Sequence, residues 1–254
     1  MGATATNEYG SPDNVEYINI SKDDALAYPS VVNRTYPDAV NAHMDSTIAP
    51  FVRKSLDVID TIFSIYENKL GLSAGTLREL HIGHSGSEAR AIRSPPKYTN
   101  TGIGPIEKEK VAIGAHTDFG SLTFLHNRLG GLQVLPPNSP DWQYVRPIPG
   151  YAICNIGDSL SIFSGGILRS NMHRVVPPPG PQNGHTRWSV VFQSRPANHV
   201  ILRALEEGET VKKVISRMNP EERIRYFPNV TQGEWYTRRR KNIRLKSMTV
   251  SRKT

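Results

Sequence analysis

The chain has 254 residues, of which 37% are hydrophobic and 21% are charged, and its net charge at pH 7 is +8. This balance excludes a chain that is disordered throughout, and the length suits one domain with a large hydrophobic core. No apolar run approaches the roughly 20 residues that a membrane-spanning helix requires, so we expect no membrane span.

Two helices are predicted in the first third of the chain, after a leader. Residues 1–41 have no sustained hydrophobic period and predict an extended leader. Apolar residues then recur every three or four positions from Ile48 to Leu70, and Gly71 follows as a stop, which predicts a long amphipathic helix. A short helix is expected near 73–80, so that residues 42–88 form a helical flank.

The pattern changes after Arg90 to short runs rich in Val, Ile, Phe and Tyr, separated by Pro-Pro, Gly-Gly and Pro-Gly pairs. Such runs predict β-strands, and their regular spacing favours a jelly roll or barrel over a parallel sheet. We therefore expect a jelly-roll core over 89–203. The predicted strands cover 89–93, 110–114, 121–125, 131–135, 142–147, 151–155, 160–163, 173–176 and 187–195.

A C-terminal helical segment with a basic tail is predicted over 204–254, because helical periodicity returns near 205–226. Eight of the 31 Lys and Arg residues lie between Trp235 and Thr254, where no acidic residue occurs, and the rest of the chain is close to neutral. Such a tail suits an anionic partner, the alternative being a solvated final helix. Nucleic acid is not the partner that we expect.

Cysteine usage indicates the compartment. Cys154 is the single cysteine, which excludes an internal disulfide and a zinc site made of several cysteines. The opening ten residues contain neither a basic nor a hydrophobic stretch that would direct secretion. We therefore expect a cytoplasmic protein.

A histidine and an aspartate two positions apart, His116 and Asp118, form the first candidate site. Residues i and i+2 of a strand point to the same face, so the imidazole and the carboxylate are expected to converge. The pair predicts two ligands of a metal ion, and the alternative is an exposed polar strand face.

Further motifs follow in a fixed order: Asn-Ile-Gly-Asp at 155–158, His-Arg-Val at 173–175 and Arg-Trp-Ser at 187–189. Together with His-Thr-Asp at 116–118, they resemble the Fe(II)- and 2-oxoglutarate-dependent dioxygenases, and within them the isopenicillin-N-synthase-like family. The resemblance covers roughly residues 88–203 of this chain.

The resemblance implies a double-stranded β-helix (jelly roll), mainly β with flanking helices, in which His116, Asp118 and His173 bind Fe(II). Two imidazoles and one carboxylate on one side of the metal leave positions open for a bidentate keto acid and O2. Arg187 and Ser189 are implied to bind the far carboxylate of 2-oxoglutarate, because a guanidinium fork matches a carboxylate and the hydroxyl adds a donor.

The activity that the resemblance implies is oxidation of a C–H bond of a small organic molecule in specialised metabolism. The outcome is hydroxylation, desaturation, ring closure or demethylation, with Fe(II) as cofactor and with 2-oxoglutarate and O2 consumed. No catalytic residue beyond the metal ligands is expected, since the protein supplies binding and orientation. Leu122, Phe124 and Phe192 are predicted to line the substrate pocket.

Other functions remain open on the sequence alone. An iron oxidase that uses O2 without 2-oxoglutarate needs the same ligands, with Arg187 and Ser189 binding a substrate carboxylate. A truncated, non-catalytic metal-binding protein would use its basic tail to contact an acidic partner. A hydrolytic zinc site uses similar ligands but gives Arg187 and Ser189 no role.

The sequence departs from the family at two places. Members of this branch usually carry a longer N-terminal region, so the leader at 1–41 is expected to be a remnant of a region that this chain mostly lacks. The family also often has Tyr or His before the first Pro-Pro of the early strand, where this chain has Ser94.

Overall fold

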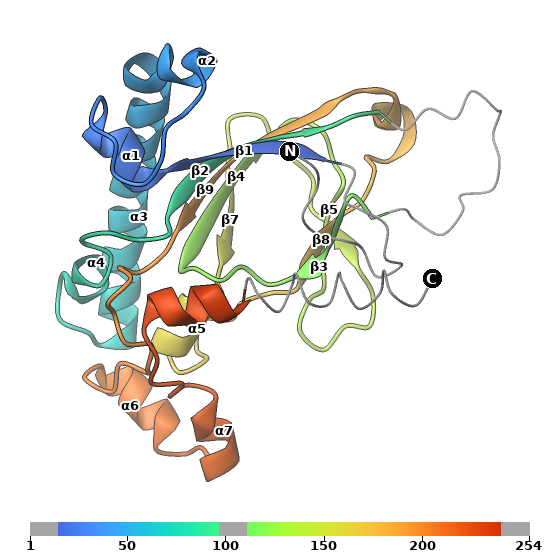
Figure 1. Ribbon diagram of the computed structural model, residues 1–254. Coiled ribbons are helices and arrows are strands. Elements are labelled where there is room, and N and C mark those ends of the chain that lie inside the picture. The colour runs from blue at the N-terminus through green and yellow to red at the C-terminus, as the bar shows by residue number, and fades with distance from the viewer. Residues whose placement is uncertain (1–14, 97–110, 240–254) are drawn as a thin grey trace, which may run out of the picture.

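The computed structural model describes residues 15–96 and 111–239, and their strands form two antiparallel sheets (Figure 1). The larger sheet has the order β1 (Glu16–Ser21), β2 (Glu88–Ser94), β9 (Arg187–Ser194), β4 (Leu122–Asn127) and β7 (Ile153–Ile156). The smaller sheet has the order β3 (Ile113–His116), β8 (His173–Val175), β5 (Leu132–Val134) and β6 (Gln143–Tyr144). The predicted jelly roll with flanking helices is confirmed.

Helices cover the outer face of the larger sheet, and α3 runs along it while the smaller sheet lies on the opposite side (Figure 1). No helix in the described part of the chain is long and apolar enough to span a bilayer. The helices are α1 (Lys22–Ala27), α2 (Asp38–Asn41), η1 (Met44–Ile48), α3 (Ala49–Leu70), α4 (Thr76–Glu79), α5 (Asp158–Phe163), η2 (Gly180–Gly184), α6 (Glu209–Ile215), α7 (Pro220–Ile224) and a helical stretch at 232–239.

The long helix α3 confirms the helical periodicity of its sequence. Its buried face includes Val52, Ile59 and Phe63, which recur at helical spacing. The helix ends at Gly71, whose φ of 72° lies in the left-handed region that glycine adopts without steric strain. This helix supplies the apolar surface against which the larger sheet packs.

Alternation along the strands of the larger sheet separates two hydrophobic clusters. Phe124 lies opposite Phe192 in the β4–β9 pair, and both pack on the helical side with α3. Leu125 and Ile153, on the other face, pack with Val175 of the smaller sheet. The interior between the two sheets is therefore the face that follows Leu125, not the face that follows Phe124.

The predicted strand at 160–163 is wrong, because this segment is the helix α5. Its buried residues are Ser159, Leu160, Ile162 and Phe163, a spacing that fits one face of a helix. Short apolar runs fit a buried strand and a buried helical turn equally well, so periodicity could not separate the two.

The described part of the predicted leader contains regular secondary structure. Residues Glu16–Ser21 form β1, which pairs with β2 in a register that places Ile18 opposite Ala91. The Ser21 hydroxyl then accepts a hydrogen bond from the Asp23 amide and caps α1. The rest of the leader (1–14) and the tail (240–254) lie outside the described residues, as does the first residue of the predicted strand 110–114.

A buried histidine connects the helical flank to the loop before β4. The Nδ1 atom of His81 lies 2.6 Å from the Leu77 carbonyl oxygen, and its Nε2 atom lies 2.8 Å from the Ser121 hydroxyl. A neutral ring with the proton on Nδ1 donates to Leu77 and accepts from Ser121. Burial lowers the pKa of His81 to about 4, so the folded protein keeps this ring neutral.

We expect the free energy of unfolding to fall as the pH decreases from about 6.5 towards about 4, because in this window the unfolded state protonates His81 and the folded state does not. The loss should be on the order of 2 kcal/mol. Urea unfolding across this pH range should show a smaller loss for His81→Gln than for the wild type. The exposed His199→Gln is the control, and an equal loss in His81→Gln and wild type would contradict the prediction.

Candidate metal centre and anion site

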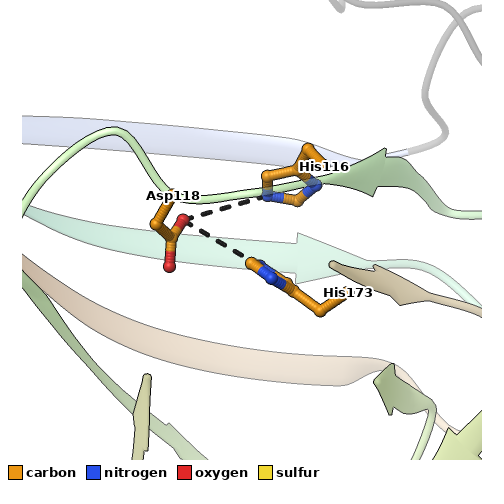
Figure 2. A group of neighbouring side chains, drawn as sticks. All are labelled: His116, Asp118 and His173. Carbon is orange, nitrogen blue, oxygen red and sulfur yellow. Dashed lines mark ion pairs between the residues drawn. The ribbon is translucent and has the colours of Figure 1, made fainter. Parts of the chain in front are cut away.

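The antiparallel pairing of β3 and β8 places His116 directly opposite His173. Asp118 follows β3 by two residues, and its carboxylate turns towards both rings (Figure 2). Its Oδ1 atom lies 4.0 Å from Nε2 of His116 and 3.9 Å from Nε2 of His173. One potential ligand atom from each residue lies within 4.8 Å of the others, so a single metal ion can contact all three.

Backbone carbonyl groups orient both imidazoles. Nδ1 of His116 lies 2.7 Å from the Gly114 carbonyl oxygen, and Nδ1 of His173 lies 3.2 Å from that of Asn171. Donation from a protonated Nδ1 leaves the Nε2 lone pair free, and a metal-binding imidazole requires such a lone pair. The side chains are thus held in the tautomer that binds a metal.

The environment favours neutral histidine and ionised aspartate. Burial lowers the pKa of His116, and the neighbouring His173 lowers it further. Burial alone would raise the pKa of Asp118, but His173, His116 and the side chain of Asn155 outweigh it, so that this pKa is lowered. Metal ligands must be deprotonated, so these shifts prepare the site for a cation.

Close backbone contacts fix the loop that carries Asp118. The Asp158 amide donates to the Asp118 carbonyl oxygen at 2.8 Å, and the Ser159 amide donates to the Gly120 carbonyl oxygen at 2.9 Å. A Cβ atom on Gly157 would lie 2.2 Å from the Gly120 carbonyl oxygen, so only glycine permits this approach. The Gly-Asp of the 155–158 motif therefore holds residues 117–121, the metal loop, in place through backbone contacts.

Two amide side chains that sequence reasoning missed contact the Asp118 carboxylate. Asn155 Nδ2 donates to Oδ2 at 2.7 Å, and Gln193 Nε2 lies 3.5 Å from Oδ1. They belong to β7 and β9 of the larger sheet and point into the interior. Polar residues within otherwise apolar strands were the available signal, but a single sequence does not show which face they occupy.

Arg187 and Ser189, the predicted co-substrate residues, lie together at the start of β9. Both are almost fully buried, with exposed fractions of 3% and 2%. Arg187 Nε donates to the Gly130 carbonyl oxygen at 2.9 Å, and Nη1 donates to Ser189 Oγ at 2.6 Å. Nη2 has no hydrogen-bond partner among the described residues.

Ser94 is a further polar residue at this position, across the β2–β9 pair from Arg187. It is 8% exposed, and its hydroxyl lacks a hydrogen-bond partner in the described structure. Both side chains line a small cavity with Val175 and His185. A buried cation and a hydroxyl without a partner, both at one cavity, are chemically suited to an anion, and we refer to them as the candidate anion site.

Leu122, Phe124 and Phe192 lie elsewhere than the sequence analysis predicts. Their exposed fractions are 1%, 6% and 0%, and all three pack in the cluster that includes α3. They occupy the face of the larger sheet that points away from the smaller sheet and its two histidines. The three side chains therefore do not face the candidate metal site, contrary to the prediction that they line the substrate pocket.

The donor set fits a cation that accepts two nitrogen ligands and one carboxylate oxygen. This combination, with further positions left open, is the one that non-haem Fe(II) oxygenases use. Zinc sites of the hydrolytic type share these ligands, so the three residues alone do not choose between the metals. The cavity at Arg187 and Ser94 is also lined by Val175 of β8, the strand that carries His173. A ligand with a carboxylate or a similar group suits this cavity.

Comparison with known proteins agrees with this site. Residues 90–196 match the sequence model of the 2OG-Fe(II) oxygenase superfamily. A 2-oxoglutarate-dependent dioxygenase of Aspergillus fumigatus is 28% identical over 249 residues, covering 90% of this chain and 61% of that protein. One of Amanita muscaria is 45% identical over 83 residues, covering 32% of this chain and 40% of that protein. The chain thus spans less than two thirds of the length of these relatives.

Solved structures share the fold. A full-length Neurospora crassa protein in complex with alpha-KG has a TM-score of 0.71 at 23% identity, covering 91% of this chain and 66% of that one. A rice dioxygenase for auxin oxidation has a TM-score of 0.55 at 22% identity, covering 73% and 58%. Over residues 90–196 the chain is therefore similar to the 2OG-Fe(II) oxygenase superfamily.

Proposed function

We propose that the protein is an Fe(II)- and 2-oxoglutarate-dependent oxygenase that oxidises a C–H bond of a small organic molecule. The observation that carries this proposal is the buried guanidinium of Arg187, which no carboxylate of the described residues neutralises. Buried charges are normally paired, so this cation requires an anionic ligand. The site therefore suits a carboxylate co-substrate.

Position along one strand connects the anion site to the metal site. His173 begins β8 and Val175 ends it, and Val175 lines the cavity that holds Arg187. Two residues of a strand span roughly 7 Å. A short dicarboxylate is therefore suited to place one end at His116, Asp118 and His173 and the other at Arg187.

The roles of the anion-site residues follow from their hydrogen bonds. Burial lowers the pKa of Arg187 to about 10, so the group stays protonated at neutral pH. Ser189 accepts from Arg187, which leaves its own hydroxyl proton free to donate to a carboxylate. Arg187 Nη2 and the hydroxyls of Ser94 and Ser189 together offer three donors.

His116, Asp118 and His173 would hold Fe(II) in this reading. When bound, the iron supplies O2 activation, which couples the oxidative decarboxylation of 2-oxoglutarate to oxidation of the substrate. Asn155 and the Gly114 and Asn171 carbonyl groups orient the ligands.

The finer assignments follow from the motifs. We place the protein in the isopenicillin-N-synthase-like branch and in specialised metabolism, since its Aspergillus fumigatus relative is a fungal 2-oxoglutarate-dependent dioxygenase. A single cysteine favours the cytoplasm. An anionic partner for the basic tail stays a prediction, because most of that tail lies outside the described residues.

The co-substrate is tested by anaerobic titration of the Fe(II)-loaded protein with 2-oxoglutarate, following the visible charge-transfer band of an iron-chelated keto acid. We expect the band in the wild type, its loss in His116→Ala, and at least a roughly 10-fold weaker 2-oxoglutarate affinity in Arg187→Ala, because a charged hydrogen-bonded pair disappears. Arg93→Ala removes an exposed arginine of the same sheet and is the matched control.

The outcomes separate the candidate functions. Iron binding with no band in the wild type would contradict 2-oxoglutarate use and favour an oxidase whose substrate carboxylate occupies the Arg187 site. Iron binding with a band but no succinate in the presence of O2 would favour a non-catalytic protein. An equal effect of Arg93→Ala and Arg187→Ala would remove the anion site from the proposal.

Ser94→Ala should weaken 2-oxoglutarate binding by roughly 3- to 10-fold, because one hydrogen bond to a carboxylate is lost. Its thermal midpoint should stay close to that of the wild type, since the hydroxyl has no partner to lose among the described residues. The exposed Ser64→Ala on α3 serves as control. The prediction fails if titration gives the same affinity for Ser94→Ala and the wild type.

A further inference from the structure

The helical stretch at 232–239 packs against the loop that carries Asp118, beside α5 (Figure 1). We propose that Arg239 is a positioning residue, which holds this loop in the geometry that binds the metal. The inference rests on the proposed function, because it takes His116, Asp118 and His173 as the metal ligands.

Three polar groups meet at the end of this stretch. Arg239 Nη2 donates to Asp158 Oδ2 at 2.8 Å and to Thr117 Oγ1 at 3.1 Å. Thr117 Oγ1 in turn donates to Asp158 Oδ2 at 3.1 Å. The guanidinium therefore binds the residue that lies between the two ligands His116 and Asp118.

Asp158 carries the contact to the ligand itself. Its carboxylate accepts from Arg239 while its amide donates to the Asp118 carbonyl oxygen at 2.8 Å. Arg239 thus fixes both the side chain of Thr117 and the residue that supports the backbone of Asp118. A shift of Arg239 would release the metal loop at two points.

Two residues of the helical stretch, Arg239 and Tyr236, also contact the Phe119 ring of this loop. The Arg239 guanidinium lies over the Phe119 ring at 4.6 Å, and Phe119 makes an edge contact with Tyr236 at 6.5 Å. Gln232, at the other end of the stretch, accepts from Ser159 Oγ at 2.8 Å, and Ser159 also donates to the Phe119 carbonyl oxygen. The C-terminal stretch therefore contacts the loop at Thr117 and Phe119, and it contacts α5 at Ser159.

A positioning role differs from a purely stabilising one in its measurable effect. The Arg239 and Asp158 side chains are 36% and 17% exposed, and ion pairs of this exposure add little to global stability. Residues that orient metal ligands, in contrast, typically change metal affinity by 10- to 100-fold when mutated. We therefore expect Arg239 to affect metal affinity much more than the thermal midpoint.

The test is Mn(II) titration of the metal-free full chain, by calorimetry or by the EPR signal of free Mn(II). We expect Arg239→Ala to raise the Kd for Mn(II) by roughly 10-fold, and Arg239→Lys to restore part of it, because lysine keeps the charge but not the planar fork. Amide exchange should be faster at 114–121 in Arg239→Ala than in the wild type.

Arg223→Ala is the matched control, because Arg223 also pairs with a carboxylate, Glu206 at 3.0 Å, and lies over a ring, Phe227 at 5.0 Å. It belongs to α7 and its ion pair and ring contact involve no residue of the metal loop, so its Mn(II) affinity should match the wild type. An unchanged Mn(II) affinity in Arg239→Ala would overturn the inference, as would an equal loss in Arg223→Ala.

Thr117→Val provides a second variant if Arg239→Ala fails to fold. It removes only the hydroxyl shared with Arg239 and Asp158, and we expect a weaker Mn(II) affinity with a thermal midpoint near that of the wild type. Unchanged affinity would overturn the inference. A wild-type protein that binds no Mn(II) or Fe(II) would instead overturn the proposed function, so the two failures are distinguishable.

Discussion

The candidate site depends on the antiparallel register of β3 and β8, which sets His116 opposite His173. The register shifts between Ile113 and His116, and after this irregularity the two histidines are directly opposed, a position in which residues of an antiparallel pair lie about 5 Å apart. The ring centroids are accordingly 4.3 Å apart. A slip of one residue in this register would turn one ring to the opposite face of the sheet and separate the two nitrogen ligands. The hydrophobic cluster between the sheets, to which Val175 of β8 belongs, stabilises this register and hence the site.

The second constraint is that polar side chains between the two sheets need hydrogen-bond partners. Arg187, Asp118, Asn155 and Gln193 all come from segments that also bury apolar residues, and each has at least one hydrogen bond. These polar groups therefore share the space between the sheets with the apolar cluster of Leu125, Ile153 and Val175. Two of the buried polar groups without a hydrogen-bond partner in the described structure, Arg187 Nη2 and the Ser94 hydroxyl, belong to residues that line one cavity. An unpaired buried donor is unfavourable in the free protein, so an anion that satisfies both gains affinity from this arrangement.

The sequence predicts the site better than it predicts the surroundings of the site. The predicted site residues belong to short motifs whose residue types reflect chemistry. The structure brings His116, Asp118 and His173 close together and joins Arg187 to Ser189 by a hydrogen bond. The helix α5 and the strand β1 were missed because their formation depends on packing and on pairing with β2, which local patterns do not contain. Alternation along a strand places some of Leu122, Phe124 and Phe192 in the core but does not say which, and the structure packs all three in the cluster that includes α3. The contacts of Arg239 join positions 122 residues apart, and no spacing rule predicts such a contact.

Residues that contact the loop of Asp118 lie both inside and outside the segment that matches the superfamily. That segment covers 90–196 and includes 157–159 and Gln193, which contact Asp118 or its loop, whereas the stretch 232–239, which also contacts this loop, lies beyond it. Three metal ligands can be brought close by the β3–β8 pair and its following loop alone, but a loop ligand loses order when its outer contacts are absent. Since metal affinity depends on how well ligands are fixed before binding, the residues that follow the matched core contribute to the chemistry of the core. Helices outside this core can therefore tune the metal centre without any change in the three ligands.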